Sequence, residues 1–319
     1  MKPNDITLEL AKTIGQPIDS AFPVPVELLE IADIDRVPFG EKVYVFDYDD
    51  NTDTVYSAGL DGQVTANRKS PSGSTELTFV GLQSELSYVS LHSLQDSTDN
   101  TALARKKVSI GRSMDKKEVK MICDAILALD GDTGEPDLSV SCTETGDDIW
   151  TVIQKMIERV ADYGDNFILL AGADVVTAIN KYDRDNVDNF HYKLTIAEDL
   201  LAKNKVELVK VIGEIKTDSG SSLAVLDSKT AILVARNSKI KGVGGKPILF
   251  VRRLIDPGVA KEMGIAPDAA ERLISNLGGL QVVSTTNILG YGVIGYEAIT
   301  LAITRYKDIC YCDMDAILS

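Results

Sequence analysis

A long stretch of helical periodicity lies between residues 96 and 130. Apolar side chains recur there at steps of three and four residues, with Lys and Arg between them: Ala104, Val108, Met114, Val119, Ile122, Ile126 and Leu129. This spacing predicts an amphipathic helix, which Gly111 interrupts and Gly131 ends. Because each helical residue rises 1.5 Å, a helix of about 30 residues spans roughly 45 Å. We expect an element that is long for a compact domain.

Helical and strand patterns alternate after this stretch. Thr145 with Asp148 three positions later predicts a helix start, and Gly164 is expected to end that helix. One apolar face lies between them: Ile149, Ile153, Met156, Ile157 and Val160. A buried strand at 167–170 and a second helix at 174–182 are predicted to follow.

The remainder of the chain favours strands. Short β-rich runs occur at 206–212, 223–226, 231–234 and 248–251, and a short helix is expected at 267–277. Apolar and polar side chains alternate from 298 to 311, which is typical of a half-buried strand. We expect this strand to close the chain.

The first part of the chain is rich in proline. Half of the ten prolines of the chain lie in its first 38 residues: Pro3, Pro17, Pro23, Pro25 and Pro38. Proline fixes φ and lacks a backbone N–H, so this part can form neither one continuous helix nor a central strand. It is expected to be an extended arm that lays its apolar side chains on another surface.

A long polar segment separates the next predicted strands. Residues 42–48 have a strand pattern, and 76–80 and 86–91 are candidate partners. The segment between them, 49–74, is rich in Gly, Ser, Asn and Asp and exceeds ordinary connection lengths. It is either disordered or a two-stranded arm that reaches away from the body, and such an arm is marginal without a surface to lie on.

Composition narrows the class of protein. The 319 residues are enough for about two domains, and 44% apolar with 25% charged residues are average for a globular protein. With 48 acidic against 33 basic residues the net charge is −15, which disfavours a protein that holds nucleic acid by neutralising phosphates. No run approaches the roughly 18 apolar residues of a membrane-spanning helix, so no membrane partner is expected.

Histidine and cysteine do not indicate a catalytic or metal site. His92 and His191 lie near no nucleophile motif and are interpreted as structural or surface residues. The four cysteines are too scattered for a disulfide framework and are expected to be reduced, mostly buried thiols. Cys310 and Cys312 would share one side of a strand, but two further zinc ligands are missing.

Acidic and glycine-rich motifs also have structural interpretations. Asp47, Asp49 and Asn51 imitate the start of a calcium loop, but the sixth and twelfth positions carry Thr and Ala where Gly and Glu are needed. The run Gly242 to Lys246 lacks the spacing of a phosphate-binding loop and favours a tight turn. Asp147 and Asp148 suit the first turn of a helix, where the dipole favours acids. We assign no catalytic, cofactor-binding or metal-binding residue and expect no enzyme activity.

The order of these elements resembles the tailed-bacteriophage major capsid proteins of the Hong Kong 97 type. Two sequence patches add to the resemblance, Gly-Asp-Asp-Ile-Trp-Thr-Val-Ile-Gln-Lys-Met-Ile and Phe-Ile-Leu-Leu-Ala-Gly-Ala-Asp-Val-Val-Thr-Ala-Ile. The resemblance implies an α+β fold with an N-terminal arm at 1–41 and an axial α/β domain at 146–295. A peripheral domain would comprise 42–145 and 296–319, with an extended E-loop at 49–75 and a spine helix at about 96–130. The strand from 298 to 312 would return to the peripheral domain.

The resemblance also implies a function and partners. The chain would be the major capsid protein of a tailed double-stranded DNA phage, located in the virion and assembled in the host cytoplasm. Its partners would be itself, as hexamers and pentamers of an icosahedral shell, a portal, a decoration protein, and DNA through weak contacts. Because the chain begins directly with its arm, the resemblance implies a separate scaffolding protein or a processed form of the chain. Arg68 and Lys69, at the tip of the E-loop, are predicted to contact an acidic patch on the adjacent subunit.

Two alternatives remain open. One is a shell protein of an encapsulin-type bacterial compartment, which resembles capsids in fold and encloses cargo enzymes. The other belongs to a different class, an α/β enzyme with an unrecognised site.

Overall fold

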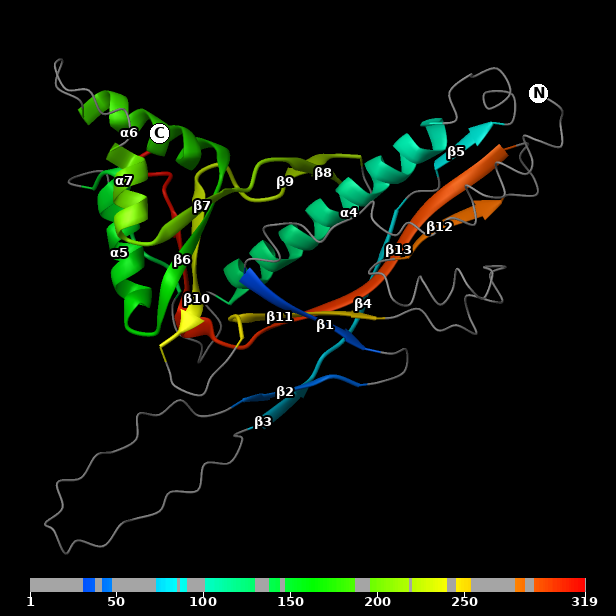
Figure 1. The fold of residues 1–319 in the computed structure, drawn as a ribbon, viewed down its shortest axis with the longest axis horizontal. Helices are drawn as coiled ribbons and strands as arrows, with labels where there is room; N and C mark the ends of the chain where they lie inside the picture. The colour runs from blue at the N-terminus through cyan, green and yellow to red at the C-terminus, as the bar shows by residue number, and fades with distance from the viewer. Residues whose placement is uncertain are drawn as a thin grey trace, which may run out of the picture.

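The computed structural model describes twelve stretches of the chain. They are residues 31–37, 42–47, 73–84, 87–90, 101–129, 138–143, 147–186, 196–217, 220–239, 245–253, 279–284 and 290–318. These stretches form a mixed α+β structure built around two sheets of six and four strands (Figure 1). The α+β class is therefore confirmed.

The six-stranded sheet is organised around one long strand. Its main path runs β1 (Ala32–Val37), β11 (Ile248–Arg253), β13 (Gly290–Ile303) and β12 (Gly279–Ser284), and β4 (Val80–Gln83) and β5 (Ser87–Ser90) also pair with β13. Strand β1 is parallel to β11, whereas the other pairs are antiparallel. Thus 31–37, within the predicted arm, forms an edge strand and does not lie at the centre of the sheet.

The four-stranded sheet has the order β14 (Ile309–Asp313), β10 (Thr230–Ser238), β6 (Gly164–Ala171) and β7 (Val206–Lys210). Its two central strands each contain an unbroken apolar run, at 167–171 and 231–235, because both faces of the sheet are covered there. Alternate side chains of β6 enter two different hydrophobic clusters, Leu169 on one face and Ile168 on the other. In the same way Leu233 and Ile232 of β10 divide between these clusters.

Three helices pack near one face of this sheet. They are α5 (Ile149–Ala161), α6 (Ala173–Asn186) and α7 (Ile196–Lys203). Side chains from all three join the cluster that contains Leu169 and Leu233. Helix α5 begins at the N-cap Asp148, whose carboxylate accepts a hydrogen bond from the backbone N–H of Thr151 at 2.7 Å. Capping satisfies one of the free N–H groups at the helix start.

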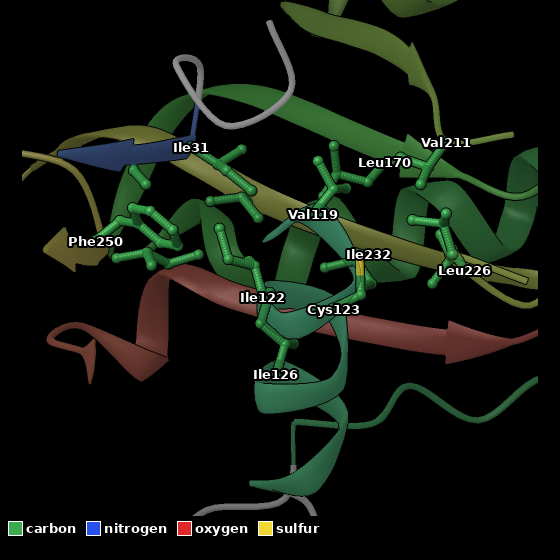
Figure 2. Packing of buried hydrophobic residues seen from close by; sticks show 14 of the residues in the cluster. Ile31, Val119, Ile122, Cys123, Ile126, Leu170, Val211, Leu226, Ile232 and Phe250 are labelled. Carbon is green, nitrogen blue, oxygen red and sulfur yellow. The ribbon is translucent and has the colours of Figure 1, made fainter. Parts of the chain in front are cut away.

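The long helix α4 (Thr101–Ala128) joins the two sheets. Its side chains Val119, Ile122 and Ile126 are buried in the second cluster, which also receives Phe250 from the six-stranded sheet and Ile232 from the four-stranded sheet (Figure 2). One core therefore spans both sheets and α4. The predicted long helix is confirmed, and it continues through Gly111 without a break.

The expectation of a single closing strand over 298–311 is wrong. Strand β13 ends at Ile303, a short 3₁₀ helix η1 (Tyr306–Asp308) follows, and β14 joins the other sheet. The break is fixed by hydrogen bonds from the N–H groups of Thr304 and Arg305 to the carbonyl oxygen of Pro247, at 2.8 and 3.2 Å. These bonds turn the chain away from β11.

The sheets combine residues from different predicted domains. Strands β11 and β12, from the range 146–295, lie in the six-stranded sheet, while β14, from 296–319, lies in the four-stranded sheet. The division into an arm, a peripheral domain and an axial domain stays a prediction.

Several element boundaries differ from those expected. Asp148 is itself the cap of α5, Gly164 begins β6 instead of ending α5, and residues 77–79 of the predicted strand 76–80 lie between β3 (Gly73–Glu76) and β4. Strand β1, helix α7 and strand β8 (Glu214–Lys216) were not expected, whereas β9 (Ser222–Ala224), which pairs with β8 in a hairpin, overlaps the predicted run 223–226. The helix predicted at 267–277 lies outside the described residues.

Candidate functional site

A two-stranded sheet holds together the two ends of the long polar segment. Strand β2 (Tyr44–Asp47) pairs antiparallel with β3, so that Asp47 lies opposite Gly73. Arg68 and Lys69, the predicted contact residues, lie outside the described residues. The β2–β3 sheet is the base of the long polar segment, because the chain enters the segment after β2 and comes back into the sheet at β3.

Charged and aromatic side chains cover this base. The Lys42 Nζ lies 2.9 Å from a carboxylate oxygen of Glu76, and the Tyr44 hydroxyl donates to the same carboxylate at 3.5 Å. The hydrogen bond and the charge of Glu76 raise the pKa of Lys42. Tyr44 is 46% exposed, and Val80 is 49% exposed. Tyr44 belongs to the β2–β3 sheet, whereas Val80 is the first residue of β4.

The β8–β9 hairpin is a second exposed element. Its inner side chains Ile215 and Val225 enter the core shared with α4, whereas Ile212 and Leu223 stay exposed at 58% and 47%. The hairpin is attached to the long helix by Lys116, whose Nζ donates to the carbonyl oxygen of Glu214 at 3.5 Å.

A buried ion pair attaches α4 to the six-stranded sheet. The Arg252 guanidinium on β11 donates to both carboxylate oxygens of Glu118 at 2.5 and 2.6 Å, and their side chains are only 6% and 1% exposed. The adjacent Arg253 lies over the ring of Phe79 at 4.2 Å from the centroid. The ion pair thus joins α4 to β11, whereas the Arg253 contact joins β11 to the residue just before β4.

Sequence reasoning missed the Glu118–Arg252 pair. The signal was present in part, since Glu118 lies four residues from both Met114 and Ile122 on the apolar face of the helix. A carboxylate on such a face needs a buried partner. Arg252 is 134 positions away, so the partner could not be identified from the pattern.

The remaining sequence candidates have local roles where the structure describes them. The Asp147 carboxylate accepts from Lys155 Nζ at 2.7 Å and from the N–H of Thr143 at 2.9 Å, and these bonds, with Lys155 foremost, lower its pKa. Gly245 has φ +85°, a left-handed value that favours glycine. A Cβ there would lie 2.3 Å from a carboxylate oxygen of Asp33. His92 and His191 lie outside the described residues.

The described residues show no constellation for metal chemistry or membrane insertion. No three His, Cys, Asp or Glu side chains gather in that part of the chain in a way that could hold a metal ion. None of its helices combines the length and apolar character of a membrane span. Three of the four cysteines, Cys123, Cys310 and Cys312, are buried, Cys142 is partly exposed, and all four are free, as expected.

Comparison with known proteins links this architecture to phage shells. No protein-family model matches the sequence, and no curated protein matches it. Several solved structures are similar to this one. A structure from Microbacterium phage Oxtober96 has a TM-score of 0.54 and 11% sequence identity, and the match covers 95% of this chain and 96% of that chain. The mature capsid of bacteriophage PhiM1 has a TM-score of 0.51 and 9% sequence identity, and the match covers 95% of this chain and 91% of that chain. The structure of a virus-like particle from Pyrococcus furiosus has a TM-score of 0.50 and 12% sequence identity, and the match covers 97% of this chain and 97% of that chain.

These likenesses extend over nearly the whole length of each chain, so they concern the complete architecture and not one shared motif. Identities of 9–12% are too low to carry function with them. The resemblance that the order of elements indicated is confirmed at the level of the fold. The protein has the fold of phage capsid proteins.

Proposed function

We propose that the chain is the major capsid protein of a tailed double-stranded DNA phage and that it assembles into an icosahedral shell around the genome. The observation that carries this proposal is the likeness to the PhiM1 mature capsid over more than nine-tenths of both chains. Its role would be structural and not enzymatic. It would reside in the virion and assemble in the host cytoplasm.

The described elements support specific assignments within this proposal. Helix α4 would be the spine helix, and the β2–β3 sheet would be the base of the E-loop at 49–75. The four-stranded sheet with α5, α6 and α7 would form most of the axial domain. Arg68 and Lys69 would contact an acidic patch of the adjacent subunit at the loop tip.

The shell would be built from hexamers and pentamers of this chain. A separate scaffolding protein would guide their assembly, a portal would occupy one vertex, and a decoration protein could bind outside. Contacts with packaged DNA would be weak, since the chain carries a net charge of −15 and supplies few counter-charges for phosphate.

A shell other than a phage head, such as an encapsulin-type compartment, is the second candidate, because one of the similar structures is described as a virus-like particle and not as a phage capsid. The likeness to the Pyrococcus furiosus virus-like particle covers 97% of both chains. No corresponding observation favours the α/β enzyme alternative.

Particle contents separate the two candidates. The chain is produced with the neighbouring genes of its source, and purified particles are treated with nuclease and then opened. Protected double-stranded DNA of genome length is expected from a phage head. Particles that hold a folded enzyme and no protected DNA would instead identify a compartment.

A further inference from the structure

Two cysteines meet where the segment after α4 runs beside the last strand. Ser139 and Tyr311 form a parallel bridge, with the N–H of Val140 donating to the carbonyl of Tyr311 at 2.8 Å. In return the N–H of Tyr311 donates to the carbonyl of Leu138 at 3.1 Å. The backbone of 138–143 is therefore fixed against β14.

Side chains alternate along extended backbone, so Val140 and Cys142 lie on one side of this segment. Both pack against the cluster that buries Cys310 and Cys312 of β14. Cys142 Sγ donates to the carbonyl oxygen of Asp313 at 3.1 Å, and Cys312 Sγ lies 3.5 Å from the same oxygen. Both sulfurs therefore lie against the same carbonyl oxygen.

The other two cysteines face elsewhere. Cys310 Sγ lies 3.5 Å from the carbonyl oxygen of Met156 on α5, inside the core. Cys123 belongs to the cluster on the opposite side of the four-stranded sheet. Cys142 is the one cysteine that solvent partly reaches, so it is the thiol that an oxidant meets first.

We propose that Cys142 and Cys312 form an intrachain disulfide when the protein meets a disulfide oxidant such as glutathione disulfide. The Cys142 thiolate attacks one glutathione sulfur, which forms a mixed disulfide and releases a glutathione thiolate. The Cys312 thiolate then attacks the Cys142 sulfur and releases the second glutathione. Two protein thiols are oxidised, one glutathione disulfide is reduced to two glutathione molecules, and these take up the two protons.

The second step is expected to control the rate. Burial, followed by the neighbouring Cys142, raises the pKa of Cys312 to about 12. Because the thiolate is the nucleophile, closure of the mixed disulfide should accelerate about tenfold for each pH unit between pH 7 and pH 9. The sulfurs must also approach to about 2.05 Å, which requires rotation of the side chains within their present contact.

The bond would link the segment that follows α4 to the strand that ends the four-stranded sheet. The chain between the two cysteines includes α5, α6, α7 and all strands from β6 to β13, so a long loop would be closed. Cross-links that close long loops restrict the unfolded chain most strongly. The oxidised protein should therefore melt about 5–10 °C above the reduced protein.

The test is peptide mapping of the full chain after incubation with glutathione disulfide at pH 7 and pH 9. Cleavage before Asp137 and Asp147 releases a peptide in which Cys142 is the one cysteine. Cleavage after Tyr311 separates Cys310 from Cys312. A Cys142–Cys312 peptide pair is expected, more rapidly at pH 9, and it should disappear on reduction. Cys142→Ser should abolish the disulfide, because a serine hydroxyl cannot form one. The hydroxyl can still donate a hydrogen bond to the carbonyl oxygen of Asp313, so the local packing is kept.

A double variant, Cys123→Ala with Cys310→Ala, provides the matched control and should form the bond as the natural chain does. If this double variant fails to fold, the peptide map of the natural chain still shows whether Cys142 and Cys312 are joined. Accumulation of glutathione on Cys142 with Cys312 left as a thiol would overturn the proposal. A bond from Cys142 to any other cysteine, or between two chains, would overturn it as well.

Discussion

Glu118 and Arg252 are the residues on which the position of α4 most depends. A carboxylate and a guanidinium taken out of water are costly unless they pair with good geometry. Here two short hydrogen bonds join them, between a helix and a strand that are far apart in sequence. A pair of this kind contributes more to the unique arrangement of α4 on the sheet than to net stability.

Removing one partner tests this interpretation. Glu118→Leu leaves the Arg252 charge buried opposite an apolar side chain, so the free energy of unfolding should fall by about 3–5 kcal/mol. Adding Arg252→Met should restore much of the loss. Urea unfolding of the subunit measures both changes.

The control lies on the same helix. Lys120 and Asp124 form an exposed pair at 2.8 Å, and Asp124→Asn should cost only about 0.3–0.5 kcal/mol. Equal losses for Glu118→Leu and Asp124→Asn would show that the buried pair is not structurally important.

Asp147 should make stability depend on acidic pH. Its pKa is lowered in the folded chain, chiefly by Lys155. A group with a depressed folded pKa stabilises the protein above its unfolded pKa of about 3.9, and this contribution is lost as the pH falls through the folded value. The melting temperature of the natural chain should therefore drop more steeply below pH 4 than that of Asp147→Asn. If the melting temperatures of the natural chain and of Asp147→Asn depended on pH in the same way, the stabilising role of the Asp147 carboxylate would be contradicted.

At the scale of elements, the sequence predicted best where periodic patterns are uninterrupted. Helices α4, α5 and α6 and strand β6 have clear apolar faces or runs. Strand β13 was recognised only in its last residues because Gly290, Gly292 and Gly295 interrupt its pattern. Strand β1 was missed because it follows a proline-rich stretch and is stabilised by β11, more than two hundred positions away.

The candidate contact surfaces were predictable only in part. The polar composition of 49–74 indicated a projecting segment, and pairing of β2 with β3 agrees with that interpretation. The exposed side chains Ile212 and Leu223 could not be distinguished from core residues, since apolar type alone does not show which face of a short hairpin is covered.

The long polar segment can be shortened without disturbing the β2–β3 sheet. Gly73 and Ser74 pair with Asp47 and Phe46, so they are kept. Residues 50–71 are replaced by a short Gly-Ser turn. Because the entropic cost of closing a loop grows only slowly with its length, shortening the segment should change the free energy of unfolding by no more than about 1–2 kcal/mol. Particles should no longer form.

The matched variant keeps the loop and changes only its charge. Arg68→Glu with Lys69→Glu should slow or misdirect assembly in a manner that depends on salt, because exposed charges are screened. Electron microscopy and thermal melting follow both variants. Unfolding of the shortened chain would place the segment in the core, and normal particles without it would contradict the E-loop assignment.

At the scale of the whole molecule, one core extends over both sheets and α4. The subunit should consequently behave as a firm body whose exposed hairpins make the contacts with other subunits. Its net charge of −15 keeps free subunits apart and soluble.

The same charge predicts weak binding to nucleic acid. At physiological salt the free subunit should bind duplex DNA with a dissociation constant weaker than about 10⁻⁴ M, the weak limit of ordinary non-specific binders. A filter-binding titration at several salt concentrations measures this. Tight binding with a steep salt dependence would show that the chain has a different partner.

Self-assembly is the central claim, and negative-stain electron microscopy of the purified full chain tests it most directly. The protein is imaged at high concentration and after production with its scaffolding protein. Closed icosahedral particles of uniform size are predicted, because a repeated heterologous contact that closes generates a finite shell. Monomers alone under all of these conditions would contradict the account.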